Sequence, residues 1–114
     1  MSKPAPEPRD YLPLSSQVFQ VLLSLSDGPL HGYAIIVDVG ERTGGEMRLT
    51  ASTLYDALSR LLDEALIEEL ERDDPRRRSY QLTKLGRDVA EAEARRLERL
   101  IAMARDKKLL RGRR

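Results

Sequence analysis

The amino-acid sequence predicts a mainly α-helical fold with one small β-hairpin and a long helix towards the C-terminus. Three observations support this prediction. Apolar residues recur at helical spacing in four separate segments. Two short segments of strand-forming residues flank a run of turn-forming residues. The chain has 114 residues, which is enough for one domain with a modest core and leaves little room for a second.

The first two elements follow an N-terminal arm. Residues 1–14 are expected to be flexible, because prolines alternate with small and charged residues at their start. Ser15 is a good N-cap for a first helix that runs to about residue 26, where an Asp-Gly-Pro sequence ends it. A second helix is expected over about residues 31–43, and two glycines end it.

A third helix is expected over about residues 51–64, after a short extended segment at 47–49. Thr50 serves as its N-cap. The apolar residues of this helix are spaced by four, three and four, which predicts one buried stripe: Leu54, Leu58, Leu61 and Ala65. Its other face carries Ser52, Thr53, Tyr55, Asp56, Ser59 and Arg60. Such a helix buries one face and presents the other to solvent.

Two strands and a long helix complete the chain. Residues 66–72 and 79–82 have the pattern of strands, and the turn-forming segment 73–78 joins them into an antiparallel hairpin with a basic tip. Thr83 then caps a final helix that is expected to reach about residue 109.

The order helix, helix, short strand, helix, strand, strand is typical of a winged helix-turn-helix domain. We therefore place such a domain at residues 15–83, followed by a dimerisation helix at 84–110 and a basic tail at 111–114. In this fold the helix at 51–64 enters a major groove of DNA. The loop 73–78 forms the wing beside it, over the phosphates or the minor groove.

The charges are unevenly distributed, although 20 basic and 19 acidic residues give a net charge of only +1. Residues 56–71 contain six acids and one base, whereas residues 105–114 contain six bases and one acid. The acidic stretch favours an alternative function, a winged-helix protein-interaction module without DNA binding. Within it, Asp56 can accept a hydrogen bond from a cytosine amino group, but its spacing favours an ion pair with Arg60.

Four segments, taken in order, carry a resemblance: residues 30–35 (LHGYAI), 49–55 (LTASTLY), 66–67 (LI) and 78–86 (RSYQLTKLG). As an ordered set they resemble the PadR family of bacterial transcriptional regulators, over about residues 15–105. The resemblance implies a homodimeric winged-helix repressor that binds near-palindromic operators. The short C-terminal region is similar to the small subgroup, which keeps one long dimerisation helix after the wing.

The resemblance also implies DNA contacts by residues of the second helix, the third helix and the wing: Tyr33, Thr53, Tyr55, Arg76, Arg77 and Arg78. Ser52, Ser59 and Arg60 are further candidates, because they lie on the exposed face of the third helix. The wing arginines and the tyrosine hydroxyls are expected to contact phosphates, while short side chains on the helix read base edges.

Two positions depart from the usual family pattern. The family usually has Pro at the position of Ala51, where it pre-sets the first helical turn. It usually has Gly at the position of Ala65, between the third helix and the first wing strand. If the backbone at this position is left-handed, Ala should cost about 1–2 kcal/mol.

The final helix predicts a homodimer. Its apolar residues repeat at the spacing of a helix that packs along another helix: Ala90, Ala94, Leu97, Leu100, Ile101 and Ala104. A small-molecule effector is compatible with this arrangement, but the sequence does not identify one. Since no aromatic residue follows Tyr80, we expect no planar drug to stack between the subunits, as occurs in some relatives.

The sequence predicts neither an enzyme nor a metalloprotein. It contains no Cys and a single His, and no set of residues has the spacing of a catalytic constellation or a phosphate-binding loop. No apolar run approaches the roughly 20 residues that span a bilayer. We therefore expect a cytoplasmic protein without a cofactor, whose partners are a double-stranded DNA operator and a second copy of the chain.

Overall fold

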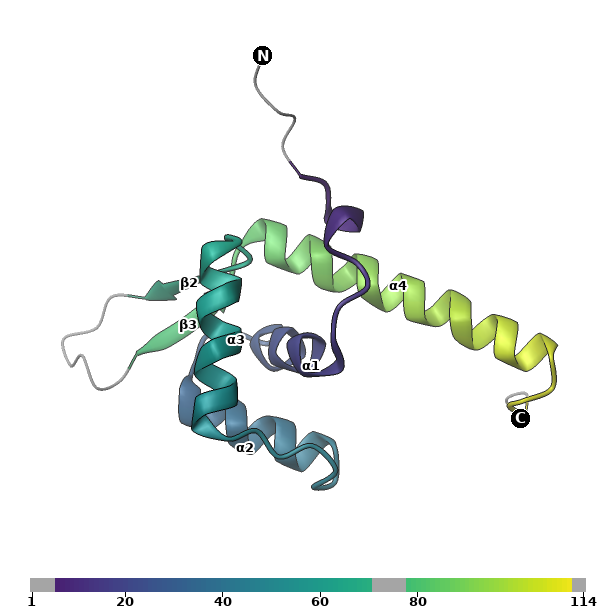
Figure 1. Cartoon of the computed structure of the whole chain (residues 1–114), viewed down its shortest axis with the longest axis horizontal. Coiled ribbons are helices and arrows are strands. Elements are labelled where there is room, and N and C mark those ends of the chain that lie inside the picture. The colour runs from purple at the N-terminus through teal and green to yellow at the C-terminus, as the bar shows by residue number, and fades with distance from the viewer. Residues whose placement is uncertain (1–5, 71–77, 112–114) are drawn as a thin grey trace, which may run out of the picture.

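Four α-helices, a 3-10 helix and a three-stranded antiparallel sheet make up the computed structural model, which describes residues 6–70 and 78–111 (Figure 1). The elements are η1 (Pro8–Tyr11), α1 (Ser16–Leu25), β1 (Leu30–His31), α2 (Gly32–Arg42), α3 (Ala51–Asp63), β2 (Ile67–Leu70), β3 (Ser79–Leu82) and α4 (Lys84–Asp106). This architecture confirms the predicted mainly α-helical winged fold with a β-hairpin and a long last helix.

Side-chain caps begin α1, α3 and α4 where the sequence predicts them, and α2 has a further cap that the sequence analysis does not name. The Ser15 hydroxyl accepts a hydrogen bond from a backbone N–H in the first turn of α1, over 3.1 Å. The Thr50 and Thr83 hydroxyls do the same for α3 and α4, over 3.1 and 3.0 Å. At α2, His31 Nδ1 accepts from the backbone N–H of Ala34 over 3.3 Å. Each cap satisfies a donor that the helix itself leaves without a partner.

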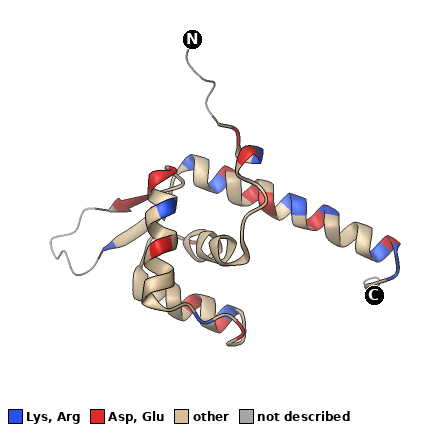
Figure 2. Ribbon diagram, viewed as in Figure 1, with Lys and Arg blue, Asp and Glu red and all other residues tan. Residues whose placement is uncertain are grey.

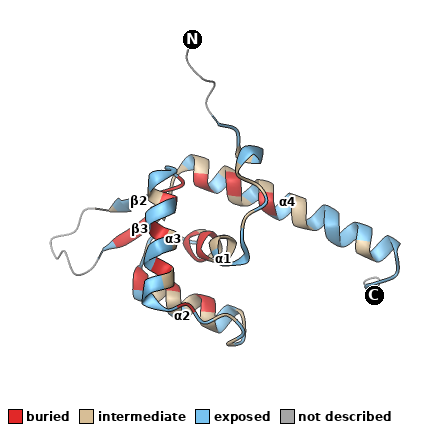
Figure 3. Ribbon diagram, viewed as in Figure 1, coloured by how far each residue is buried: buried red, intermediate tan, exposed pale blue. Residues whose placement is uncertain are grey.

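The hydrophobic core lies where α1 packs against α2, α4 and β3 (Figure 3). All four α-helices contribute apolar residues to this core, whereas Ala65, predicted as the last residue of the buried α3 stripe, is exposed and lies beyond the end of α3. The fully buried residues include Val21, Leu22 and Leu25 from α1, Ile35 and Val39 from α2, and Leu54, Leu58 and Leu61 from α3. The core thereby fixes which face of α3 stays outside.

The short strand lies before α2, not between α2 and α3 as the sequence analysis predicts. In the sheet order β1-β3-β2, Leu30 pairs with Tyr80, and Ile67 pairs with Leu82. Residues 47–49 form no strand within the described chain, and Leu49 is buried. A two-residue strand carries no readable alternation of polar and apolar residues, so backbone pairing with β3 decides its place.

The N-terminal segment packs against the domain from residue 8 onwards, which differs from the flexible arm predicted over residues 1–14. The helix η1 lies against α4, and three apolar residues around it pack on the core: Tyr11, Leu12 and Leu14. A buried carboxylate holds this segment, because Glu93 of α4 accepts a hydrogen bond from the Leu14 backbone N–H over 2.8 Å. Glu93 is 1% exposed.

Glu93 also forms an ion pair with Arg96, which compensates the burial of its charge. The hydrogen bonds from Arg96 lower the pKa of Glu93 most strongly, and the Leu14 N–H lowers it further, while burial opposes both. The sequence gives one signal of this contact, an acidic residue that lies in phase with the apolar stripe of α4.

Replacing Glu93 by Gln should reduce the free energy of unfolding by about 1–3 kcal/mol at pH 7, because a charge-assisted hydrogen bond is lost. The folded state holds the pKa below the ordinary 4.5. The difference in the free energy of unfolding between the wild type and Glu93→Gln should therefore be complete above about pH 4.5 and disappear as the pH falls further. Urea unfolding across this range measures it. The exposed Glu91→Gln is the control, and an equal loss in both variants would contradict the role of Glu93.

The backbone turns from α3 into β2 through a left-handed residue that is not glycine. Ala65 has φ 59°. The N–H groups of Ala65 and Leu66 donate to the carbonyls of Leu62 and Leu61, both over 3.0 Å, which closes the end of α3. Ala65 therefore has the left-handed backbone for which the sequence analysis expects a cost of about 1–2 kcal/mol, and its side chain strains this turn.

Substitution of Ala65 by Gly should stabilise the protein by about 0.5–1 kcal/mol, since relief of the left-handed strain exceeds the added entropy of the unfolded chain. Ala57→Gly, inside α3, is the matched control and should lose about 1 kcal/mol. Urea midpoints at one fixed protein concentration report both values. A loss of stability in Ala65→Gly would show that the turn is not strained.

Candidate nucleic-acid interface

The helix α3 has one buried face and one fully polar exposed face. Leu54, Leu58 and Leu61 are at most 2% exposed and point into the core. Successive residues of an α-helix are rotated by about 100° around the helix axis. By this rotation, Ser52, Asp56 and Ser59 lie on the side of α3 opposite to the three leucines. These outward residues are exposed. The fold therefore presents a row of short polar side chains along the outer side of α3.

Other candidate residues of α3 flank this row. Arg60 is exposed, but it also lines a cavity of about 120 Å³ with Tyr11 and Pro13, which places it on the side towards the N-terminal segment. Thr53 is half-buried, and its hydroxyl accepts a hydrogen bond from the Thr50 hydroxyl over 2.9 Å. The Thr53 hydroxyl therefore belongs to the cap of α3, a role that the sequence pattern did not reveal.

Two exposed tyrosines lie on α2 and α3, Tyr33 in the first turn of α2 and Tyr55 in α3. Tyr33 is 66% exposed, and Tyr55 is 50% exposed. The Tyr55 hydroxyl packs over the first residue of α2, since a Cβ atom at Gly32 would lie 2.9 Å from its oxygen. Glycine at position 32 thus makes room for the Tyr55 ring. The Tyr55 hydroxyl therefore ends at the start of α2, the turn of the helix that also carries Tyr33.

The hairpin formed by β2 and β3 lies beside α3, and its strand β3 pairs with β1, which ends next to Gly32 (Figure 1). Arg78, which directly precedes β3, is exposed, and its Nε lies 3.4 Å from Glu69 Oε1. Arg76 and Arg77, which the sequence analysis places at the basic tip, lie outside the described residues. Tyr80 on β3 is 3% exposed and belongs to the core, where burial raises the pKa of its hydroxyl.

Acidic and basic side chains both occur on α3 (Figure 2). Asp63 and Glu64 lie at its C-terminal end, close to the acidic residues of β2. The predicted ion pair between Asp56 and Arg60 does not form, since no ion pair among the described residues includes Asp56. Before Arg60, α3 carries a single charged residue, Asp56.

A polar network that the sequence analysis missed joins α1 to α2. The Asp38 carboxylate accepts hydrogen bonds from the Ser24 hydroxyl over 2.7 Å and from Arg42 Nε over 2.8 Å. These two bonds lower the pKa of Asp38. Arg42 also donates to the backbone oxygen of Gln20 over 3.0 Å. The network fixes α2, which in turn supports α3 and the two tyrosines.

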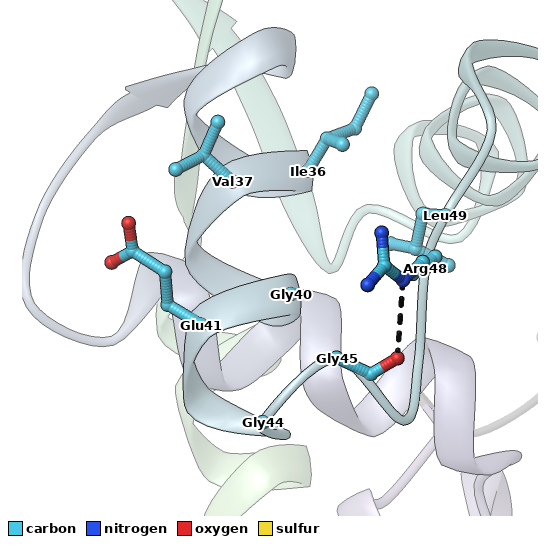
Figure 4. Close-up of a pocket in the computed structure, with 8 residues that line it drawn as sticks. All are labelled: Ile36, Val37, Gly40, Glu41, Gly44, Gly45, Arg48 and Leu49. Carbon is cyan, nitrogen blue, oxygen red and sulfur yellow. Dashed lines mark hydrogen bonds between the residues drawn. The ribbon is translucent and has the colours of Figure 1, made fainter.

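A groove of about 530 Å³ lies between α2 and residues 44–49 (Figure 4). The Arg48 side chain stands across from Gly40 in this groove, and its Nε donates to the Gly45 carbonyl oxygen over 3.3 Å. Leu49, which also lines it, is followed directly by the Thr50 cap. This segment therefore positions the start of α3.

The residues predicted to form the dimer contact lie along α4, whose second half extends beyond the rest of the domain (Figure 1). Ala90 packs partly against the core of its own domain. Further along, Leu100 and Ile101 are 46% and 41% exposed, Ala94 is exposed, and Leu97 and Ala104 are half-buried. Val89 and Glu93 are buried on one face of α4. In the second half of the helix, the apolar residues that continue this face are not packed against the rest of the domain.

These features define a winged-helix domain with a long helical extension. The chain belongs to the transcriptional regulator PadR-like family, whose pattern matches residues 21–92. This match confirms the family resemblance that the four sequence segments indicate. Within residues 6–70 and 78–111, every helix is too short or too polar to cross a lipid bilayer.

Solved structures and one sequence relative resemble the chain. A PadR family transcription regulator from Clostridium difficile has a TM-score of 0.70 at 24% identity, covering 81% of this chain and 97% of its own. Bacillus subtilis PadR, in complex with operator DNA, has a TM-score of 0.61 at 25% identity, covering 68% and 47%. An uncharacterized 37.1 kDa protein in transposon TN4556 of Streptomyces fradiae is 44% identical over 80 residues. The match covers 70% of this chain and spans 22% of that relative's length.

Proposed function

We propose that this chain is a sequence-specific regulator that binds a palindromic operator in double-stranded DNA as a homodimer and represses transcription. The observation that carries the proposal is the exposed outer row of α3, Ser52, Asp56 and Ser59, in a domain that also exposes Tyr33 and Tyr55. A relative of the same family and fold is in complex with operator DNA. Such a regulator acts where the DNA is, in the cytoplasm.

Each part of the interface has its own role in this proposal. The outer side chains of α3, Ser52 and Ser59, contact base edges in the major groove. Arg60 contacts the DNA at the margin of this surface. The Tyr33 and Tyr55 hydroxyls and the wing residues Arg76, Arg77 and Arg78 bind phosphates and fix the register of the protein on the duplex. Thr53 supports the reading helix through its cap.

The homodimer forms through the uncovered apolar face of α4: Ala94, Leu97, Leu100, Ile101 and Ala104. Apolar area of this kind favours association, because pairing removes it from water. A two-fold dimer places its two reading helices about 34 Å apart, so that they enter successive major grooves on one side of the DNA.

Two single substitutions separate the wing from the reading helix. Arg77→Ala should weaken binding to all DNA sequences and reduce the salt slope of the affinity by about one unit, because one phosphate contact is lost. Ser52→Ala should leave that slope unchanged and relax base preference at one symmetric pair of positions by about 1–3 kcal/mol. Binding of both variants to a panel of single-base operator variants at several salt concentrations measures these effects.

The opposite assignment, with base preference altered by Arg77→Ala and uniform weakening by Ser52→Ala, would contradict these roles. If neither variant changed DNA affinity, the alternative function would be favoured, a winged-helix module that binds a protein. The acidic side chains at the C-terminal end of α3 and on β2 are the observation that supports this alternative.

A further inference from the structure

An exposed carboxylate occupies the centre of the row that faces outward from α3. Asp56 lies within about 20° of the direction opposite to the three buried leucines, at about 100° per residue. Ser52 comes one turn before it and Ser59 one turn after it on the same side. In any approach of this face to DNA, Asp56 therefore points at the middle of the groove.

The carboxylate of Asp56 serves no contact within the described chain. The acids Asp38, Glu69 and Glu93 each hold an arginine. By contrast, no ion pair or side-chain hydrogen bond among residues 6–70 and 78–111 includes Asp56, and helix packing does not cover it. As far as residues 6–70 and 78–111 are concerned, Asp56 is thus free to meet a group on a partner.

An acid at this position would weaken DNA binding unless the DNA supplies a hydrogen-bond donor. Phosphates repel a carboxylate, and most groups on the floor of the major groove are acceptors or methyl groups. The donors there are the amino groups of cytosine and adenine. Adenine carries the acceptor N7 beside its amino group, which would face the second carboxylate oxygen, whereas cytosine carries a C–H group at that place.

We propose that the Asp56 carboxylate reads a cytosine in each half-site by accepting a hydrogen bond from its amino group. This inference rests on the proposed DNA binding of α3 and adds the identity of one base pair. It also gives the direction in which the preference can be changed. Asn pairs with adenine through its amino group and N7 together, so Asp56→Asn should move the preference from cytosine to adenine.

Asp63 provides a matched control. It lies on the same outward side as Asp56, two turns later, at the C-terminal end of α3. Reading helices contact bases mainly with their N-terminal residues. Asp63→Asn removes the same negative charge from the same helix, so it should strengthen binding to all sequences slightly without changing any base preference.

The experiment selects binding sites from a double-stranded DNA library with randomised palindromic half-sites, using the full chain and its variants. The wild type should select cytosine at one position of each half-site. Asp56→Asn should select adenine at that position, with a change of about tenfold or more in relative affinity, and Asp56→Ala should select no base there. Asp63→Asn should select the wild-type sequence.

Each other outcome has a separate meaning. If the wild type selects a defined site and Asp56→Asn selects the same one, the role of Asp56 is refuted while DNA binding stands. If Asp63→Asn changes the same position as Asp56→Asn, a general charge effect replaces the proposed hydrogen bond. If the wild type enriches no sequence, the proposed function itself fails, and the reading of cytosine fails with it.

Discussion

The substitution Gly86→Ala should destabilise the protein by about 3–5 kcal/mol or prevent its folding. Gly86 lies in the first turn of α4, where the helix docks against the turn after α3. A Cβ atom at this position would lie 1.8 Å from the Leu66 carbonyl oxygen. That oxygen is held by the backbone N–H of Thr83 over 3.1 Å, and the Thr83 hydroxyl donates to the Ala65 carbonyl over 2.7 Å.

A side chain at position 86 must therefore push α4 away from this turn and break both contacts of Thr83, each worth about 1 kcal/mol. Urea unfolding at a fixed protein concentration measures the loss. Gly40→Ala is the control, because a Cβ atom inside α2 meets nothing within 4 Å and should stabilise the helix by about 1 kcal/mol. Equal midpoints for Gly86→Ala and the wild type would show that α4 does not dock as described.

The second large effect is expected for Ile101→Asp, which should convert the proposed dimer into a monomer. Ile101 is 41% exposed on the uncovered apolar face of α4. A carboxylate there would be buried without a partner in the proposed interface, and two-fold symmetry places it in both subunits. The dimer dissociation constant should rise about 100-fold or more, and operator affinity should fall because a monomer contacts one half-site. Sedimentation measures the first effect and operator titration the second.

Ala102→Asp is the control for this substitution. Position 102 neighbours Ile101 but lies about 100° further around α4, away from the apolar face. It is exposed, and an aspartate there should leave the dimer intact. Dissociation of both variants to the same extent would show that α4 does not associate through the predicted face.

The helices could be predicted from the sequence because each one carries an apolar stripe and three of the four also begin at a recognisable cap. Ser15, Thr50 and Thr83 supply the caps, and the leucines of α3 supply the clearest stripe. Contacts between distant segments have no such signal. The pairing of β1 with β3 and the hydrogen bond from Leu14 to Glu93 join residues that are far apart in the sequence. Only the folded chain reveals them.

The candidate site could be predicted in part for the same reason. Helical periodicity placed Ser52 and Ser59 on the outer face of α3, where the structure has them. The periodicity did not show that Thr53 belongs to the cap or that the Tyr55 ring packs over Gly32, because both depend on neighbouring groups. The spacing of Asp56 and Arg60 favoured an ion pair that the structure lacks, since exposed pairs gain little and form only when the side chains point together.

The proposal that two reading helices of a symmetric dimer bind DNA is tested most directly by a hydroxyl-radical footprint on a DNA site selected by the wild-type protein. The account predicts two equally protected half-sites, about 10 base pairs apart from centre to centre and related by two-fold symmetry. Raising the salt concentration should remove the protection of both together. Protection of a single half-site, or none at concentrations where the chain is folded and dimeric, would contradict it.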